Sequence, residues 1–332
     1  MCLMTVRHNL LQAAKRYMRE GQAPRTPRLD IDGVLLLDKP AGISSNDVLI
    51  KAKRYFNAKK AGHTGTLDPF ATGLLPLCFG EATKFSQDLL NADKTYQTIV
   101  QLGISTDTGD TEGKIVSQAQ IPVLTASEVE QVLERFRGTI RQVPPMYSAL
   151  RREGRPLYEY ARQGIELDRE AREVVIHKLE LIDWRSPYLT LSVTCSKGTY
   201  IRVLGEDIGK AFGCGAHLRM LRRTQVGDLT LEQSVGLPVL METSDASQEV
   251  RNRHLKPVDW LLSDSPALTL PDALSGRYRH GQRLSVIKEN IPMPGGEGRY
   301  RIYDAAGTFL GTAQLRADGV LAPERLVALR QS

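Results

Sequence analysis

The amino-acid sequence predicts a protein of mixed α and β structure that has a small β-rich region at its C-terminal end. Over residues 30–262, short apolar or alternating segments typical of strands are interspersed with amphipathic helical segments. Near residue 265 the sequence pattern changes: prolines precede short β-like segments that are separated by glycines. A length of 332 residues suits one large domain and one small one. We therefore expect a body at 30–262 and a second domain at 265–332, preceded by an extension at 1–29.

Local patterns predict the elements in order. The apolar run at 33–38 predicts a buried strand, and the turn after it places Ser44 or Ser45 at the N-cap of a helix. The predicted helices lie at 46–57, 127–137 and 203–212, and Gly138 ends the second of them. The predicted strands lie at 33–38, 95–102, 173–184, 189–195, 300–303 and 309–315.

The composition excludes several classes of protein. Hydrophobic residues make up 41% of the chain and charged residues 25%, and no apolar run is long enough to cross a membrane. The sequence has no P-loop, no dinucleotide-binding fingerprint and no metal-ligand cluster, so we expect neither a cofactor nor a metal. The cysteines form no C-x-x-C pair and indicate buried thiols in a reducing compartment, the cytoplasm. They are Cys2, Cys78, Cys195 and Cys214.

The net charge of +6 is unevenly distributed along the chain. Residues 1–28 contain six Lys or Arg and one acid, a net charge of +5, which leaves +1 for the remainder. Apolar residues at helical spacing interleave with these basic residues until Pro24 and Pro27 break the pattern. We interpret residues 1–29 as a mobile basic arm or as the result of an upstream choice of start codon. Any nucleic-acid surface on the body must then be a local patch rather than a global excess of charge.

The most informative stretch for function is residues 62–76, Gly-His-Thr-Gly-Thr-Leu-Asp-Pro-Phe-Ala-Thr-Gly-Leu-Leu-Pro. Its glycines let a ligand approach the main chain, and Pro69 restricts the backbone of Asp68 before it. We therefore expect a stiff loop that presents one carboxylate. Taken alone, Asp68-Pro69 is a turn signal and His63 an ordinary loop histidine, but the whole string is far more specific.

This string resembles the central motif of the TruB-type tRNA pseudouridine synthases. The resemblance covers the body from about Gly33 to Trp260, because further motifs of that family occur in the family's order. These motifs are Lys39-Pro40 with Gly42, Ser44 and Ser45, then Lys94-x-Tyr96 with Leu102-Gly103, Lys197-Gly-Thr-Tyr-Ile-Arg202 and Gly215-Ala-His-x-x-x-Leu-Arg-Arg223. The extension before residue 30 is outside the family pattern.

The resemblance implies an α+β pseudouridine synthase fold with a mixed, mostly antiparallel central sheet and an active cleft across its middle. It also implies that residues 265–332 form a PUA-like RNA-binding domain. The implied reaction is the isomerisation of a uridine in the T-loop of tRNA. Its glycosidic bond is broken, the base turns, and the base is rejoined to the sugar through C5, with no cofactor.

Asp68 is the implied catalytic residue, and it would either attack C1′ of the sugar or abstract a sugar proton to give a glycal. The resemblance makes Arg202 the ion-pair partner of Asp68. An arginine within a few ångströms lowers the pKa of a carboxyl group by about 1–3 units, so we expect an ionised Asp68.

The resemblance assigns roles to the other motif residues as well. A uridine in a folded RNA loop must flip out of its stack to reach an acid in a pocket. The aromatic ring of Tyr96 is implied to stack on the uracil, and its hydroxyl to help remove the C5 proton. The remaining implied residues are His63, which fills the space left by the flipped base, Tyr200 and Leu221, which wall the uracil pocket, and Lys39 and Pro40, which support the acid loop.

The implied partner is the T-arm of tRNA, bound by a monomer without an obligate protein partner and away from any membrane. An arginine-rich insertion at about 141–170 is expected to grip the RNA. Two alternatives remain open at this point. The chain could be the guide-RNA-dependent catalytic subunit of the same superfamily, or a tRNA-binding folding helper whose catalysis is not essential.

Overall fold

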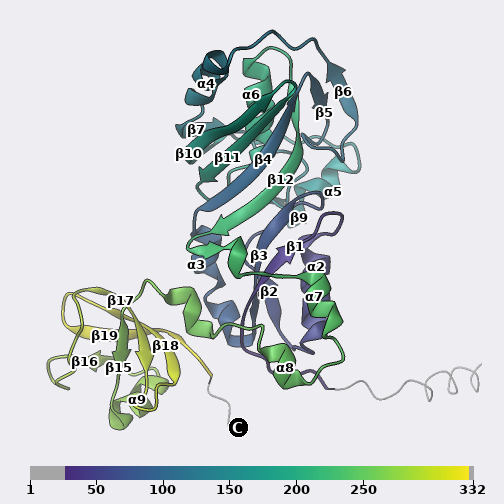
Figure 1. Ribbon diagram of the computed structural model, residues 1–332. Helices are drawn as coiled ribbons and strands as arrows, with labels where there is room; N and C mark the ends of the chain where they lie inside the picture. Colours follow the sequence, from purple (N-terminus) through teal and green to yellow (C-terminus); the bar gives the residue numbers. More distant parts are fainter. Residues whose placement is uncertain (1–26, 329–332) are drawn as a thin grey trace, which may run out of the picture.

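The computed structural model describes residues 27–328, which fold around two β-sheets (Figure 1). The larger sheet has ten strands in these residues, in the order β14-β1-β3-β12-β4-β11-β10-β7, with β2 paired to β3 and β13 to β12. Only β1–β14 and β3–β12 are parallel pairs, so the predicted mixed, mostly antiparallel sheet is confirmed. Its strands are β1 (Gly33–Lys39), β2 (Ala61–His63), β3 (Thr72–Phe79), β4 (Lys94–Leu102), β7 (Gly138–Gln142), β10 (Arg172–Arg185), β11 (Tyr188–Cys195), β12 (Ala216–Val226), β13 (Leu229–Thr230) and β14 (Val235–Gly236).

The helices flank this sheet, and the three predicted ones are present. Helix α2 (Ser45–Tyr55) is capped by Ser44, whose side chain accepts a hydrogen bond from the Asp47 N–H. Helix α4 (Ala126–Glu134) ends earlier than predicted, and Gly138, which was predicted to end it, is the first residue of β7. The others are α3 (Ser86–Asn91), α5 (Leu157–Ala161), α6 (Ile201–Ala211), α7 (Leu237–Glu242), α8 (Gln248–Asn252) and the 3₁₀ turns η1 (Gly80–Lys84), η2 (Leu231–Gln233) and η3 (Val258–Leu262).

Two short ribbons stand off the main sheet. One pairs β5 (Ile104–Thr106) with β6 (Ile115–Gln118), and the other pairs β8 (Arg151–Arg152) with β9 (Arg155–Pro156). The second ribbon lies within the predicted insertion at 141–170.

The stretch 62–76 is not the continuous loop that its sequence predicts, because its ends are strands β2 and β3. The actual loop, which we call the acid loop, comprises residues 64–71. Pro76 misleads the prediction, since proline is rare inside sheets. The carbonyl oxygen of Pro76 accepts a hydrogen bond from the Thr64 N–H. The N–H that Pro76 lacks would therefore point to the side of β3 on which Thr64 lies, and not toward β1.

Strand β12 also escapes the sequence patterns, although it lies at the centre of the sheet between β3 and β4. Its register with β4 shifts between Leu218 and Met220 and again between Arg223 and Gln225. Such bulges interrupt the alternation of apolar and polar residues by which a strand is recognised. Charged side chains on a central strand are a second departure from the usual pattern.

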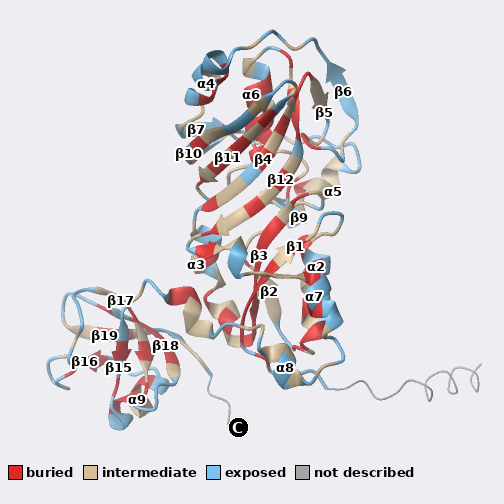
Figure 2. Cartoon of the chain, in the orientation of Figure 1, coloured by how far each residue is buried: buried red, intermediate tan, exposed pale blue. Residues whose placement is uncertain are grey.

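The core lies on both faces of the sheet near β1 and β3, where buried residues run continuously in Figure 2. Leu35 and Leu37 belong to one apolar cluster, while Val34 and Leu36 belong to another. A strand that is covered on both faces needs apolar residues at successive positions, which explains the run at 33–38. The inward face of α2 contributes Val48, Ala52 and Tyr55 to the first cluster.

The second sheet has the order β15-β17-β18-β19-β16 and its own apolar core. The strands predicted at 300–303 and 309–315 are present. This sheet packs on the body beside α3, where Arg299 forms an ion pair with Asp88 at 2.8 Å and the rings of Phe309 and Phe85 lie 5.8 Å apart. Its elements are β15 (Ala267–Thr269), α9 (Asp272–Arg279), β16 (Leu284–Ser285), β17 (Gly298–Tyr303), β18 (Phe309–Leu315) and β19 (Val320–Leu326).

The N-terminal arm, the cysteines and the absence of a membrane-spanning helix were also predicted from the sequence. The basic arm predicted at 1–29 falls almost wholly outside the described residues, as does Cys2. Cys78, Cys195 and Cys214 are free and buried, as predicted. No helix within residues 27–328 is both long and apolar enough to cross a membrane.

Gly73 generates a test of the packing between β3 and β12. Its φ is +102°, and a Cβ there would lie 2.2 Å from the Arg223 carbonyl oxygen and 2.8 Å from the Arg223 nitrogen. Gly73→Ala should therefore lower the free energy of unfolding by at least about 3 kcal/mol, as measured by urea denaturation. The control is Gly276→Ala in α9, where a Cβ meets nothing within 4 Å. It should be neutral or stabilise by about 1 kcal/mol, and equal stability of the two variants would contradict the explanation.

Candidate functional site

A cavity of about 400 Å³ opens beside the acid loop and the central strands β4 and β12. One wall is the acid loop, from Gly65 to Asp68. The sheet contributes Tyr96 from β4 and Leu221 and Arg223 from β12, and the start of α6 contributes Arg202. Segments 148–150 and 196–201 and the side chains of Leu90 and Lys94 complete the lining.

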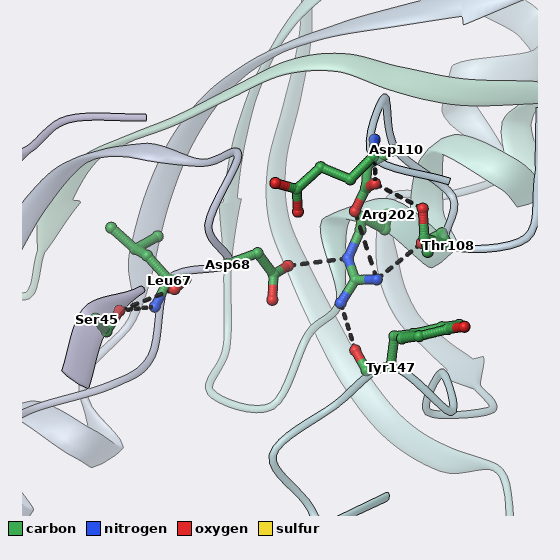
Figure 3. A network of polar contacts seen from close by, with 8 residues as sticks. Ser45, Leu67, Asp68, Thr108, Asp110, Tyr147 and Arg202 are labelled. Carbon is green, nitrogen blue, oxygen red and sulfur yellow. Dashed lines mark hydrogen bonds and ion pairs between the residues drawn. The ribbon is translucent and has the colours of Figure 1, made fainter. Parts of the chain in front are cut away.

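The cavity contains an ion pair between Asp68 and Arg202 (Figure 3). The Nε of Arg202 lies 2.9 Å from Oδ2 of Asp68. The two other guanidinium nitrogens donate to the carbonyl oxygens of Thr108, at 2.8 Å, and Tyr147, at 2.7 Å. The Arg202 side chain is 4% exposed and that of Asp68 is 34% exposed. Arg202 is thus fixed from behind, while the Asp68 carboxylate keeps a face open to the cavity.

Asp110 is a second carboxylate beside Arg202, and sequence reasoning did not select it. Its Oδ2 lies 3.7 Å from Nη1 of Arg202, and its side chain is 4% exposed. Its Oδ1 accepts hydrogen bonds from the Thr108 hydroxyl at 2.6 Å and the Glu112 N–H at 2.9 Å. The sequence signal was the run of acids at 106–113, but nothing in that run shows which acid is buried.

The prediction of a lowered pKa for Asp68 is wrong in its net direction. Burial raises the pKa of Asp68 above its ordinary value, and this effect exceeds the lowering by the Arg202 guanidinium. The negative charge of Asp110 raises the pKa further. Arg202 therefore limits a rise in the pKa of Asp68 instead of producing a fall, because desolvation disfavours the charged form of a carboxyl group.

Lys39 supports the acid loop from below without lining the cavity. Its Nζ donates hydrogen bonds to the carbonyl oxygens of Pro40, Ile43 and Pro69, at 2.8, 2.7 and 3.2 Å. The side chain is fully buried, and burial lowers the pKa of Lys39 to about 8, although Asp68 favours its charged form. Pro40 takes part only through its carbonyl oxygen. Both residues therefore lie where a supporting role predicts them.

Ser45 fixes the acid loop at the residue before Asp68. Its Oγ lies 2.8 Å from both the carbonyl oxygen and the nitrogen of Leu67 (Figure 3). Ser45 is the first residue of α2, so the helix start and the acid loop are joined.

Tyr96, Tyr200 and Leu221 line the cavity together with Asp68 and Arg202, which brings five of the predicted site residues into one place. Burial raises the pKa of both tyrosines. The backbone of Tyr200 is held at the start of α6, because its N–H donates to the side chain of Gln142 at 3.0 Å.

Among the residues predicted to contact the substrate, His63 is the one that lies outside the cavity lining. It is the last residue of β2, opposite Leu77 of β3. Its Nδ1 is buried without a hydrogen-bond partner, and burial, followed by the charge of Arg223, lowers the pKa of His63. The neutral imidazole therefore predominates at neutral pH.

Arg223 lines the cavity but was not selected from the sequence as a site residue. A signal was present, because residues two apart on a strand share a face. Leu221 was predicted to wall the pocket, so Arg223 on the same strand should face it too. Arg222, between them, instead forms an ion pair with Asp38 at 2.7 Å.

The predicted insertion at 141–170 is partly core and partly basic surface. Gln142, Ser148 and Leu157 are buried, so the tract is not only an RNA-gripping surface, as its arginines suggest, but also part of the packed interior. The tract also carries exposed arginines. They are Arg141, Arg151, Arg152, Arg155 and Arg162.

A larger hollow of about 630 Å³ lies on the far side of Thr108 and Tyr147, between this tract and α6. It does not include Asp68 or Arg202. Within residues 27–328, no group of three or more His, Cys, Asp or Glu side chains is placed to hold a metal ion.

Comparisons with protein families cover most of the chain. Residues 53–201 match the TruB family pseudouridylate synthase N-terminal domain. Residues 202–263 match the tRNA pseudouridylate synthase B C-terminal domain, and residues 266–327 match the C-terminal family of pseudouridine synthase II TruB.

Curated relatives are similar over nearly their whole length. The tRNA pseudouridine synthase B of Burkholderia mallei (strain ATCC 23344) is 57% identical over 305 residues, which are 92% of this chain and 96% of the relative. The protein of the same name from Cupriavidus metallidurans is 54% identical over 312 residues, 92% of this chain and 97% of that relative.

Among solved structures, similarity extends to the fold. An H/ACA RNP bound to a substrate RNA containing 2'-deoxyuridine contains a chain with a TM-score of 0.66 and 23% identity, covering 90% of this chain and 86% of that one. A Cbf5-Nop10-Gar1 complex gives a TM-score of 0.64 with 24% identity, covering 89% and 84%. At these identities the likeness concerns the fold alone, and it agrees with the predicted α+β class.

Proposed function

This chain belongs to the TruB family of tRNA pseudouridine synthases, and we propose that it isomerises a uridine in the T-loop of tRNA with Asp68 as the catalytic residue. The observation that carries the proposal is the Asp68 carboxylate, which faces a cavity of about 400 Å³ while a buried arginine holds it at 2.9 Å. Asp38 also pairs with an arginine, but it lies outside the cavity lining.

The chemistry requires one well-placed carboxylate. The C1′–N1 bond of the uridine breaks, and its electron pair leaves with the uracil. The base is then rejoined to C1′ through C5, C5 loses its proton and N1 gains one, so that the product is an isomer of the uridine. Asp68 either attacks C1′ and is later displaced, or removes a sugar proton to give a glycal and returns it. Both routes use the ionised carboxylate, so the guanidinium of Arg202 assists by limiting the rise in the pKa of Asp68.

The uridine must be flipped out of the RNA to enter this cavity, at a cost of about a few kcal/mol. In our proposal the ring of Tyr96 stacks on the flipped uracil, and Tyr200 and Leu221 close the pocket around it. His63 lies outside the cavity lining, on the strand that leads into the acid loop. This place suits a side chain that fills the gap in the RNA and does not touch the reacting atoms.

The RNA is gripped by basic side chains in this proposal. The insertion carries exposed arginines and contributes residues 148–150 to the cavity wall, and Lys197 also lines the cavity. Such side chains contact phosphates without reading sequence. We propose that the protein works on tRNA in the cytoplasm as a monomer, without a guide RNA, a cofactor or an obligate protein partner.

Residues 265–332 are proposed to bind the tRNA away from the reacting uridine. The sequence places Arg277, Arg279 and Arg283 close together, but Arg277 pairs with Glu289 and Arg279 with Asp304. Among the described residues of this domain, the exposed lysines and arginines that form no ion pair are Arg283, Lys288, Arg316 and Arg325. They are the candidates for phosphate contacts.

Asp68→Asn tests the central claim, because it keeps the shape of the side chain and removes its charge. We expect the rate of pseudouridine formation on unmodified tRNA to fall by more than about 1000-fold, with tRNA affinity nearly unchanged, since phosphate contacts dominate affinity. The matched control is Asp38→Asn, which removes a carboxylate of similar exposure that also pairs with an arginine. It should retain the wild-type rate.

The outcomes separate the alternatives. Turnover of Asp68→Asn within tenfold of wild type would refute the assignment of Asp68. A wild-type protein that modifies bare tRNA only after a guide RNA is added would be the guide-dependent subunit. A wild-type protein that binds tRNA and never forms pseudouridine would be the folding helper.

The pH dependence of the reaction follows from the raised pKa of Asp68. The ionised form is active, so the rate falls as the pH drops through the pKa, and this acid limb lies above the ordinary range of an aspartate. Arg202→Met removes a lowering influence and should move the limb to still higher pH, as well as reduce the plateau rate. Single-turnover rates measured between about pH 5 and about pH 8.5 report both the position of the acid limb and the plateau rate. An acid limb at the same pH in both proteins would contradict the proposed role of Arg202.

The C-terminal domain can be tested without removing it from its contacts with the body. The double variant Arg283→Glu and Lys288→Glu should raise KM for whole tRNA while kcat at saturation is unchanged, which indicates lost uniform binding. The salt dependence of binding should also weaken, by about 0.7 to 0.9 in slope for each phosphate contact. An isolated T-arm stem-loop should be modified equally by both proteins. Equal losses on the two substrates would show that the domain does not act through distant RNA contacts.

A further inference from the structure

Arg223 is a buried cation for which the body offers no counter-charge. Its side chain is 1% exposed, and within residues 27–328 it takes part in no ion pair, unlike Arg202 and Arg222. Removing a guanidinium from water without a carboxylate partner costs on the order of several kcal/mol. The positive charge of Arg223 affects its neighbours, because it lowers the pKa values of Lys39, His63 and Lys94. A fold that keeps such a charge at the wall of its reaction cavity has a use for it there.

The guanidinium of Arg223 connects strand β12 to the start of the acid loop and to strand β3, which follows the loop. Its Nε donates to the carbonyl oxygen of Leu74 at 2.8 Å, and its Nη2 donates to that of Gly65 at 3.2 Å. Gly65 lies before Asp68 in the chain and Leu74 lies after it. The backbone of the same arginine pairs with Gly73. The position of Asp68 therefore depends on Arg223 as well as on Arg202.

The same side chain lies beside Tyr96. Arg223 and Tyr96 are directly opposite each other in the pairing of β12 with β4, and both line the cavity. Residues in this relation on one face of an antiparallel pair have Cβ atoms about 5 Å apart. The charge of Arg223 opposes the effect of burial, which raises the pKa of Tyr96. The Arg223 side chain thus lies next to both the acid loop and Tyr96.

We propose that Arg223 is a positioning residue for the reaction, which fixes the acid loop and the ring of Tyr96 relative to each other and supplies a positive charge at the Tyr96 hydroxyl. The proposal deepens the function proposed above and rests on it. Arg223 does not touch the reacting atoms. It acts through Asp68 and Tyr96, the first of which reacts at the sugar while the second holds the base.

The test compares Arg223→Gln with Arg222→Gln. Arg222 is the neighbouring arginine on the same strand, but it faces Asp38 and is outside the cavity lining. Single-turnover pseudouridine formation by Arg223→Gln should be slower by about 100-fold, the scale for misplaced catalytic groups. Its affinity for tRNA should stay within about threefold of wild type, because the phosphate contacts remain. Arg222→Gln should keep the wild-type rate.

A second readout needs no activity. The ultraviolet absorbance change on tyrosine ionisation is recorded for each free protein and for its Tyr96→Phe derivative, and the difference isolates Tyr96. In Arg223→Gln the Tyr96 midpoint should move to higher pH, while in Arg222→Gln it should not. The rate of the double variant Tyr96→Phe, Arg223→Gln should be no slower than that of the slower single variant, because residues that act as a unit are not additive.

Arg223→Lys separates charge from reach. Lysine keeps the positive charge but lacks the planar fork that spans two carbonyl groups. We expect its Tyr96 midpoint to stay close to wild type while its rate still falls. If Arg223→Gln does not fold, this variant decides the question, and a wild-type rate for it would overturn the proposal.

Other results would also overturn the proposal. They are an unchanged rate in folded Arg223→Gln, an equal loss in Arg222→Gln, an unmoved Tyr96 midpoint in Arg223→Gln, or additive effects of the Tyr96 and Arg223 variants. Failure of the proposed function is recognised separately, because an active Asp68→Asn would remove the function while leaving the titration of Tyr96 intact.

Discussion

The guanidinium of Arg202 has to be satisfied on every side, because it is buried to 4% exposure, and the segments that satisfy it are those that build the site. Asp68 approaches from the acid loop, and the carbonyl groups of Thr108 and Tyr147 approach from two other loops (Figure 3). A buried charge with partners missing is strongly destabilising. Three stretches of chain that are distant in sequence are thereby required to meet at one point, and the carboxylate arrives there with its position set.

The central strands supply the rigid frame for this meeting point. Strand β12 pairs with β4 on one side and touches β3 on the other, so Leu221 and Arg223 enter the cavity next to Tyr96. The acid loop leaves from β2 and returns into β3, while Lys39 and Ser45 fix it to the end of β1 and the start of α2. A short loop attached at both ends to a sheet, and again at its middle, has little freedom to move the acid it carries.

The sequence predicted the parts of this arrangement that local patterns encode. The apolar run of β1, the capped helix α2 and the alternating strand β4 were recognised, and a family motif located Asp68 and Arg202. The missed parts depend on contacts between distant segments. Strand β3 contains a proline that is tolerated because of the edge it faces, and strand β12 is interrupted by bulges. The burial of Asp110 and Arg223 exists only after the chain has folded. The raised pKa of Asp68 likewise follows from desolvation by burial in the folded chain.

The contact of the C-terminal sheet with the body has a consequence for the shape of the substrate. Arg299 and Asp88 form an ion pair, the rings of Phe85 and Phe309 pack together, and Lys84 donates a hydrogen bond to the Leu326 carbonyl, so the two sheets are joined by more than a linker. Leu90, on the helix that contains Asp88, lines the cavity. If the cavity and the C-terminal domain both hold RNA as proposed, the distance between the two RNA-binding regions is fixed. The protein would then select its substrate by the span of a rigid, folded RNA, and an unfolded strand carrying the same uridine would fail to fit both regions at once.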